Sequence, residues 1–212
     1  MRATAWTISL KSLEGPLGPP AAAQAAERAD RADVLAEWQL VQRAQRHDEA
    51  AIQALYETYY PKIYNYAFMQ MGDIHASEDL ASDVMLKMIE SLHKYTFRGL
   101  PFGAWVFRIA RNRLIDLHRR RQRRGEVDLN ETLAATLASP QVLAERALER
   151  GQLQVALKHL TGEQRQVIVL KFIEGFDNRS AGKIMGRSEG AIKSLQHRAL
   201  GALRRVLDYG DR

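Results

Sequence analysis

Residues 101–124, PFGAWVFRIARNRLIDLHRRRQRR, mix eight arginines with bulky apolar side chains, and few folds accommodate both. At 3.6 residues per turn the two compositions separate. One face collects Val106, Ile109, Ala110, Leu114 and Leu117, and roughly the opposite face collects Arg108, Arg111, Asn112, Ile115 and Arg119. The segment is therefore predicted to be a helix that packs on its apolar side and directs cations outward, toward an anionic ligand.

Helical spacing also dominates the chain before this segment. Within residues 77–95 the apolar positions are spaced by four, at Leu80, Val84, Met88 and Leu92. Ser77 is predicted to be the N-cap of that helix, and Asp48 is predicted to be the N-cap of an earlier helix. Pro61 lies inside the earlier helix and should kink or restart it. With no strand-like alternation and no internal repeat, the fold is predicted to be all-α.

Changes in composition divide the chain into two small helical domains joined by a flexible linker. Residues 1–30, rich in Gly, Pro and Ala, are expected to form a disordered N-terminal tail, followed by a first domain over 31–124. Residues 125–145 are locally acidic and interrupted by Pro140, which is typical of a linker. A second helical domain is predicted over 146–212, with Thr161 as a helix cap.

Residues 179–207 have the pattern of a helix-turn-helix. Gly182 supplies a small residue where two helices pack closely, Gly186 suits the turn, and Ser188 can cap the second helix. The second helix places Ile192, Leu195, Ala199 and Leu203 toward the core. Its N-terminal half leaves polar residues outward, and this half enters the DNA major groove in such motifs. An ordinary helical hairpin with a basic, solvated face is the alternative.

Charge and composition restrict the function. The formal net charge is +6 and the pI is about 9.7, which favours a polyanionic partner. Cysteine is absent, and no apolar run reaches the roughly 20 residues that span a bilayer. We expect a cytoplasmic protein without membrane insertion. The six histidines are scattered, and no nucleophile, phosphate-binding or metal motif is evident, so we expect no enzyme activity, no cofactor and no metal.

Residues 48–207 resemble the extracytoplasmic-function (ECF) group of bacterial RNA polymerase sigma factors, of the sigma-seventy family. Three blocks carry the resemblance in order: SEDLASDVMLKMIESL (77–92), FRGLPFGAWVFRIARNRLIDLHRRR (97–121) and EGFDNRSAGKIMGRSEGAIKSLQHRAL (174–200). The resemblance makes 31–124 sigma region two and 146–212 sigma region four. Many relatives carry glutamate and alanine where this chain has Ser180 and Gly182, which suggests a softer first helix in the motif.

The resemblance implies that the second block reads and melts the minus-ten element. The loop 96–103 would border a pocket for an unstacked base, Asn112 would bond a base edge, and arginines would hold phosphates. Trp105 could equally line that pocket or belong to the core. The implied minus-ten residues are Phe97, Arg98, Phe102, Trp105, Arg108, Arg111, Asn112, Arg119 and Arg120.

Two further surfaces are implied by the resemblance. The polar stripe of the first block would bind the β′ clamp helices of core RNA polymerase, although an isolated stripe of this kind is more often a solvated face. Its residues are Asp79, Asp83, Lys87 and Glu90. The helix-turn-helix would read the minus-thirty-five element through Arg187, Lys193, Ser194, Gln196, His197 and Arg198.

The resemblance therefore predicts a promoter-specificity subunit. It would bind core RNA polymerase, through β′ and the β flap, recognise promoter DNA and promote strand opening. Members of the family often have an anti-sigma factor as a further partner. The alternative is a stand-alone helix-turn-helix regulator of duplex DNA, which would not need the arginine–aromatic segment.

Overall fold

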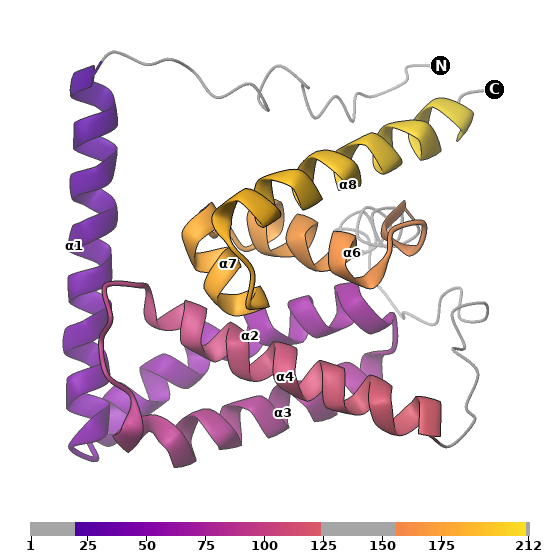
Figure 1. Ribbon diagram of the computed structural model, residues 1–212. Coiled ribbons are helices and arrows are strands. Elements are labelled where there is room, and N and C mark those ends of the chain that lie inside the picture. The colour runs from indigo at the N-terminus through magenta and orange to yellow at the C-terminus, as the bar shows by residue number, and fades with distance from the viewer. Residues whose placement is uncertain (1–19, 124–155, 211–212) are drawn as a thin grey trace, which may run out of the picture.

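The computed structural model describes residues 20–123 and 156–210, with side chains for 33–123 and 156–205. Every regular element in these ranges is helical, so the predicted all-α class is confirmed. The N-terminal module contains α1 (Pro20–Gln45), α2 (Glu49–Met71), α3 (Ile74–Ser91), the 3₁₀ turn η2 (Leu92–Lys94) and α4 (Phe102–Arg123). The C-terminal module contains α6 (Gly162–Ile168), the π-helical turn η3 (Val169–Ile173), α7 (Asn178–Met185) and α8 (Glu189–Gly210) (Figure 1).

The start of α1 differs from the prediction. The helix begins at Pro20, inside the stretch 1–30 that was expected to be a disordered tail. Proline suits the first helical position, and the alanines that follow have the highest helix propensity, so a local preference for helix outweighs the loop-like composition. Residues 1–19 and the predicted linker at 125–145 lie outside the described residues.

Helix α2 confirms one predicted cap and corrects the expected break. The Asp48 side chain accepts a hydrogen bond from the Ala51 amide at 3.1 Å, as an N-cap does. Pro61 was expected to kink or restart the helix, and the restart is wrong, because α2 continues through the proline as one element. Leu55 before the proline and Ile63 after it are buried in the same core, and this packing holds the helix together across the proline.

Helix α3 begins earlier than predicted. Asp73, and not Ser77, is its N-cap, because the Asp73 carboxylate accepts from the Ala76 amide at 3.0 Å. Ser77 lies buried in the first turn, where its hydroxyl donates to the Asp73 carbonyl. The predicted apolar stripe is confirmed, since all four of its residues are buried: Leu80, Val84, Met88 and Leu92.

The C-terminal module is built as the helix-turn-helix pattern predicts. Thr161 caps α6 in a reciprocal capping box with Gln164. Gly186 adopts a φ of 65° at the turn between α7 and α8, and Ser188 caps α8 by accepting from the Ala191 amide. The buried core of this module comprises Leu157, Leu160, Val167, Ile168, Val169, Leu170, Ala181, Ile184, Met185, Ile192, Leu195 and Ala199.

The two modules pack against each other. Helix α7 lies across the N-terminal half of α4, and α6 and η3 contact α2 (Figure 1). The α4 surface that faces the C-terminal module is thereby covered, whereas the sequence pattern had suggested two units joined only by a linker.

Candidate nucleic-acid interface

An aromatic cluster supports the segment that leads into α4. Tyr95 contacts Phe102 edge-on at a centroid distance of 4.9 Å and Trp105 at 5.1 Å. Trp38 of α1 stacks on Phe97 at 5.6 Å with the ring planes 22° apart. Burial raises the pKa of Tyr95 to about 12, with a further contribution from the nearby carboxylate of Glu37, so its phenol stays neutral. The loop 96–103 is thus held on a rigid aromatic base.

Two polar side chains of α1 fix the same loop. The Glu37 carboxylate accepts from the Phe102 amide at 2.7 Å, at the N-terminus of α4, and also from the Tyr59 hydroxyl. Gln45 donates to the carbonyls of Leu92 and Tyr95 at 2.9 and 2.8 Å. A carboxylate at a helix N-terminus complements the helix dipole and an unpaired amide. Burial raises the pKa of Tyr59 well above its ordinary value, and the Glu37 carboxylate adds to this effect.

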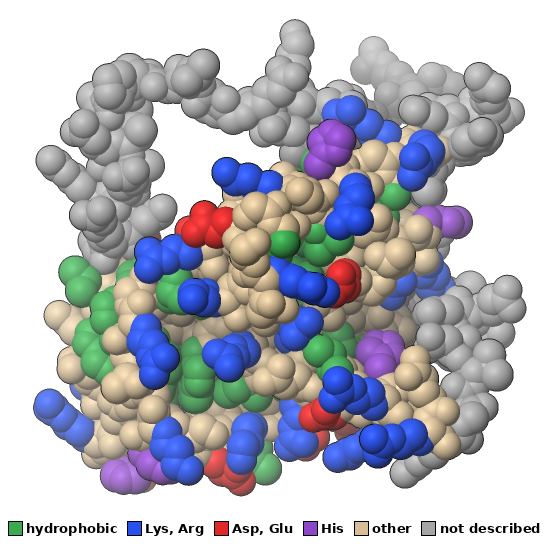
Figure 2. All heavy atoms as spheres, in the orientation of Figure 1, with side chains coloured by type: hydrophobic (Ala, Val, Ile, Leu, Met, Phe, Trp, Pro, Cys, Tyr) green, Lys and Arg blue, Asp and Glu red, His purple; other side chains and the backbone are tan. Residues whose placement is uncertain are grey.

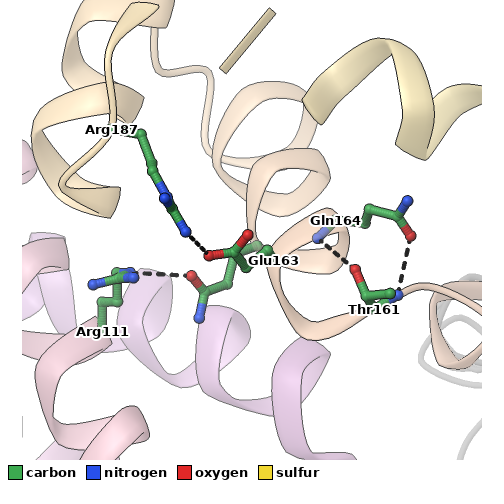
Figure 3. A network of polar contacts seen from close by, with 6 residues as sticks. Arg111, Thr161, Glu163, Gln164 and Arg187 are labelled. Atoms are coloured by element: carbon green, nitrogen blue, oxygen red, sulfur yellow. Dashed lines mark hydrogen bonds and ion pairs between the residues drawn. The ribbon is translucent and has the colours of Figure 1, made fainter. Parts of the chain in front are cut away.

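Helix α4 exposes a polar face to solvent. Arg108, Asn112 and Arg119 are exposed and lie within one face of the helix. Arg119 lies 3.9 Å from the Asp116 carboxylate, and this exposed ion pair is weak. Arg111 is only half-exposed, and its Nε donates to Gln166 Oε1 of α6 at 3.1 Å (Figure 3). Asn112 therefore lies between two exposed cations, Arg108 and Arg119, that phosphates can reach.

The helix-turn-helix presents a second polar face. Lys193, Ser194, His197 and Arg198 are exposed on α8, and Gln196 is half-buried. Arg187, in the turn, forms an ion pair with Glu163 of α6 (Figure 3). The face of α8 that would enter a groove is thus open, whereas Arg187 is tied to the neighbouring helix in this structure.

The two polar faces belong to a broadly cationic side of the molecule. Figure 2 shows lysine and arginine side chains spread over the side on which α4, α7 and α8 lie, with few acids among them. A surface of this charge attracts nucleic-acid phosphates without regard to sequence, through release of condensed counterions. Hydrogen-bonding side chains among the cations, such as Asn112 and Ser194, are the groups that can distinguish bases.

Comparison with known proteins identifies the family. Residues 55–124 match Sigma-70 region 2, and residues 156–205 match Sigma-70, region 4. The chain is 34% identical over 171 residues to the ECF RNA polymerase sigma factor BldN of Streptomyces coelicolor, covering 80% of this chain and 65% of BldN. It is 30% identical over 166 residues to SigX of Bacillus subtilis, covering 76% of this chain and 85% of SigX. The chain belongs to the ECF RNA polymerase sigma factors.

A solved structure supports the same assignment. The sigma factor RpoE of Bartonella quintana, solved in complex with the anti-sigma factor NepR, superposes with a TM-score of 0.63 and 25% identity. The superposition covers 74% of this sigma factor and 96% of the RpoE chain. Membership of the family makes the chain a promoter-recognising subunit of RNA polymerase and disfavours the stand-alone regulator.

Three aromatic residues that were expected to contact the minus-ten element are packed against other rings of the protein. Phe102 is 2% exposed and packs on Tyr59, so the prediction that it contacts DNA is corrected to a core role in this conformation. Trp105 packs between Tyr95 and Phe102 and is partly exposed, which favours the core interpretation. Phe97 is half-buried against Trp38. Arg98 is exposed, as expected.

The residues expected to contact polymerase are exposed on α3. Lys87 and Glu90 form an ion pair of 3.2 Å, and Leu86 and Ile89 beside them are exposed apolar residues. Asp79 and Asp83 line a groove between α3 and α4, where the other charged residues are Arg113, Asp116, Arg120 and Arg121. Arg120 of α4 therefore lies beside Asp79 and Asp83 of α3.

Sequence reasoning missed several residues that shape this interface. Glu37 and Gln45 occur on a helix with a clear apolar pattern, and the available signal for Glu37 was its place between the apolar residues Val34 and Trp38. Gln166 and Phe176 carried no signal, because their contacts with α4 join two modules.

Among the helices of the described residues, none is long and apolar enough to cross a bilayer.

Proposed function

We propose that this sigma factor binds core RNA polymerase through α3, opens the minus-ten element with α4 and reads the minus-thirty-five element with α8. It acts in the cytoplasm and has no catalytic activity of its own. The observation that carries the proposal is the exposed stripe of α4, in which Asn112 lies between Arg108 and Arg119 on a helix whose first residue is held by Glu37.

The chemistry of strand opening fits this stripe. Unstacking a base costs a few kcal/mol, which a protein must offset with its own contacts. Exposed arginines would hold the phosphates of the separated strand, and the amide of Asn112 would donate to and accept from a base edge. The hydrogen bonds from the Phe102 amide and the Tyr59 hydroxyl to Glu37 keep the start of α4 fixed, so little ordering energy is lost on binding.

Upstream recognition would use the open face of α8. The N-terminal half of this helix carries Lys193, Ser194 and Arg198, all exposed. Arginine and lysine contact phosphates or guanine, and serine bonds to several bases. Arg187 would join this set once its ion pair with Glu163 is exchanged for a phosphate.

The remaining contacts would be with proteins. The exposed pair Leu86 and Ile89, flanked by Asp83, Lys87 and Glu90, would dock on the β′ clamp helices, and the C-terminal module would meet the β flap. We also propose an anti-sigma factor as a regulator, because RpoE, which this chain resembles, was solved bound to one.

The test uses core RNA polymerase, the full chain, and a promoter selected from a randomised library by in vitro transcription. Asn112→Ala is expected to lower strand opening about tenfold, as loss of one base contact does, and to leave polymerase binding unchanged. Opening is measured by permanganate reactivity of unpaired thymines, and polymerase binding by fluorescence anisotropy.

Gln122→Ala is the matched control, because Gln122 is another exposed amide on α4 and has no proposed role. It should leave both measurements unchanged. Equal loss of opening and of polymerase binding in Asn112→Ala would contradict the base contact. If the wild-type protein binds duplex DNA tightly alone and polymerase gains no opening from it, the function itself is wrong.

A further inference from the structure

A groove between α1 and α2 has no role in the proposed contacts with DNA or polymerase. Its volume is about 490 Å³, and its apolar lining includes Ala36 and Leu40 of α1 and Leu55 of α2. The other residues that line it are Glu37, Gln39, Arg43, Thr58 and Tyr59. Leu55 is buried, Leu40 is half-buried and Ala36 is exposed, so the groove opens an apolar surface to solvent.

Charged and hydroxyl groups in the groove are already engaged. The Glu37 carboxylate accepts the two hydrogen bonds described above. The Thr58 hydroxyl donates to a carbonyl of its own helix at 2.7 Å, and Arg43 forms an ion pair of 2.8 Å with Asp48. A charged ligand would have to displace these partners, whereas an apolar side chain would leave them in place. The groove therefore fits an apolar ligand.

The chain itself supplies such a ligand in the residues that precede α1. Residues 1–19 join the helix at Pro20, and they contain the apolar segment AWTISL (5–10). No charged residue occurs between Arg2 and Lys11, and the segment places Trp6 and Ile8 close together. Apolar side chains of this size gain free energy when they leave water, so the segment favours a site that buries it.

The length of this stretch matches the distance to the groove. Ala36 follows Pro20 by 16 residues, which is roughly 24 Å along a helix. The 13 residues 7–19 can span up to about 43 Å when extended, so Trp6 can reach back to Ala36. Leu17 cannot, because the chain between it and Pro20 spans at most about 10 Å.

The sequence of α1 also provides a path to the groove. Positions 22, 25, 29 and 32 are all alanine, and their spacing of three and four continues to Ala36. These positions therefore share one face of the helix. Figure 1 shows this part of α1 extending beyond α2, α3 and α4. A chain that runs back along this face meets only small residues at these positions before it reaches the groove.

We propose that residues 5–10 dock in the groove between α1 and α2 of the same molecule, with Trp6 as the buried side chain. The covalent connection gives the segment a high effective concentration at the groove, which favours its own chain over a second copy. The docked segment contacts the wall formed by Glu37 and Tyr59, and so it stabilises the bond from Glu37 to the Phe102 amide. The N-terminal segment thereby supports the start of α4 from outside the described fold.

Docking can be measured by ¹⁹F NMR on the full chain labelled with 5-fluorotryptophan. The chain has three tryptophans, and the resonance of Trp6 is assigned with Trp6→Phe. We expect this resonance to lie away from the position of free fluorotryptophan. Ala36→Glu, which places a charge in the groove, should return it to that position. Leu35→Glu is the matched control, because Leu35 is 54% exposed and does not line the groove, and it should leave the resonance unchanged.

Covalent trapping shows which chain fills the groove. The chain has no cysteine, so Thr7→Cys and Gln39→Cys give a unique pair. With oxidised glutathione this pair should form an intramolecular disulfide about tenfold faster than Thr7→Cys paired with Gln42→Cys. Gln42 is exposed on α1 and does not line the groove. A disulfide-linked dimer on a non-reducing gel would show that a second copy fills the groove, and it would overturn docking within one molecule.

Support of α4 is read from hydrogen exchange at the Phe102 amide. Trp6→Ser should make this amide exchange about tenfold faster, a usual size for coupling between two sites. Leu17→Ser is the control, because Leu17 removes a similar apolar group that cannot reach the groove. Unchanged exchange in Trp6→Ser would overturn the support of α4.

A Trp6 resonance at the position of free fluorotryptophan in the wild type would overturn the docking itself. So would an equal response to Ala36→Glu and Leu35→Glu. These measurements use neither polymerase nor DNA, so they do not depend on the proposed function. A failure of that function would be recognised separately, as absence of strand opening by the wild-type protein with polymerase.

Discussion

Gly182 sets how closely α7 approaches the turn that follows it. A Cβ at this position would lie 2.7 Å from the backbone oxygen of Arg187, closer than real Cβ contacts come. The Gly182 carbonyl also accepts from the amides of Gly186 and Arg187, so this backbone cannot move away freely. Alanine has a helix propensity about 1 kcal/mol better than glycine, but relief of the clash requires the turn to shift.

We therefore expect Gly182→Ala to lower the free energy of unfolding by about 1–3 kcal/mol, the typical cost of overpacking. Urea unfolding followed by circular dichroism measures this change. Gly201→Ala is the control, because Gly201 is inside α8 with no atom near the added methyl group, and it should stabilise by up to about 1 kcal/mol. Stabilisation by both substitutions would show that the turn adapts to alanine.

At the scale of one element, α6 depends on its cap. It has only 7 residues, so unpaired amides at its N-terminus are a large part of its backbone polar groups. Thr161 Oγ1 accepts from the Gln164 amide at 3.3 Å, and Gln164 Oε1 accepts from the Thr161 amide at 3.1 Å (Figure 3). The helix carries Gln166, the partner of Arg111, so its cap also supports the interface with α4.

Thr161→Ala should lower the free energy of unfolding by about 1 kcal/mol, the usual cost of losing a threonine cap. Differential scanning calorimetry at fixed pH checks this. Thr58→Ala is the comparison, because Thr58 is exposed inside α2 and its hydroxyl bonds only to the Ala54 carbonyl of its own helix. Its replacement should be neutral or slightly stabilising. Equal destabilisation by both would argue against the capping box.

At the scale of the whole molecule, the packed arrangement of the two modules, here called the closed form, is expected to depend on pH through Glu174. Burial raises the pKa of this carboxyl above its ordinary value, and the Asn65 amide and the Lys62 charge on α2 partly oppose the shift. A group whose pKa is higher in the closed form binds protons more tightly there. The closed form is therefore favoured as pH falls through this raised pKa, and above it the ionised carboxylate resists burial.

The chain has no cysteine, so fluorescent dyes can be attached to cysteines introduced at the exposed positions Ser82 of α3 and Arg204 of α8. Energy transfer between these dyes should accordingly rise as the solution is made mildly acidic. In Glu174→Gln the side chain cannot ionise, so this pH dependence should be lost and closure should persist at neutral pH. An identical pH profile in wild type and variant would assign the titration to other groups.

Short segments of the sequence predict most of the helices, three of their caps and the family. Asp48, Thr161 and Ser188 cap the residues next to them, and the stripe from Leu80 to Leu92 follows helical spacing, so both are properties of short segments. Local patterns failed at Pro61, where packing keeps the helix continuous, and at the start of α3, where Asp73 and not Ser77 is the cap. The three blocks that carry the resemblance fall within the two regions that the family comparison matched.

Contacts between residues far apart in the chain are visible only in the folded protein. Glu37 reaches the Phe102 amide across 65 positions and Arg111 reaches Gln166 across 55, and no spacing rule links residues so far apart. The same holds for Phe102, which looked available to DNA in sequence and is buried in the fold. Long-range contacts depend on how complete surfaces fit together, and that fit is a property of the packed molecule that no short segment contains.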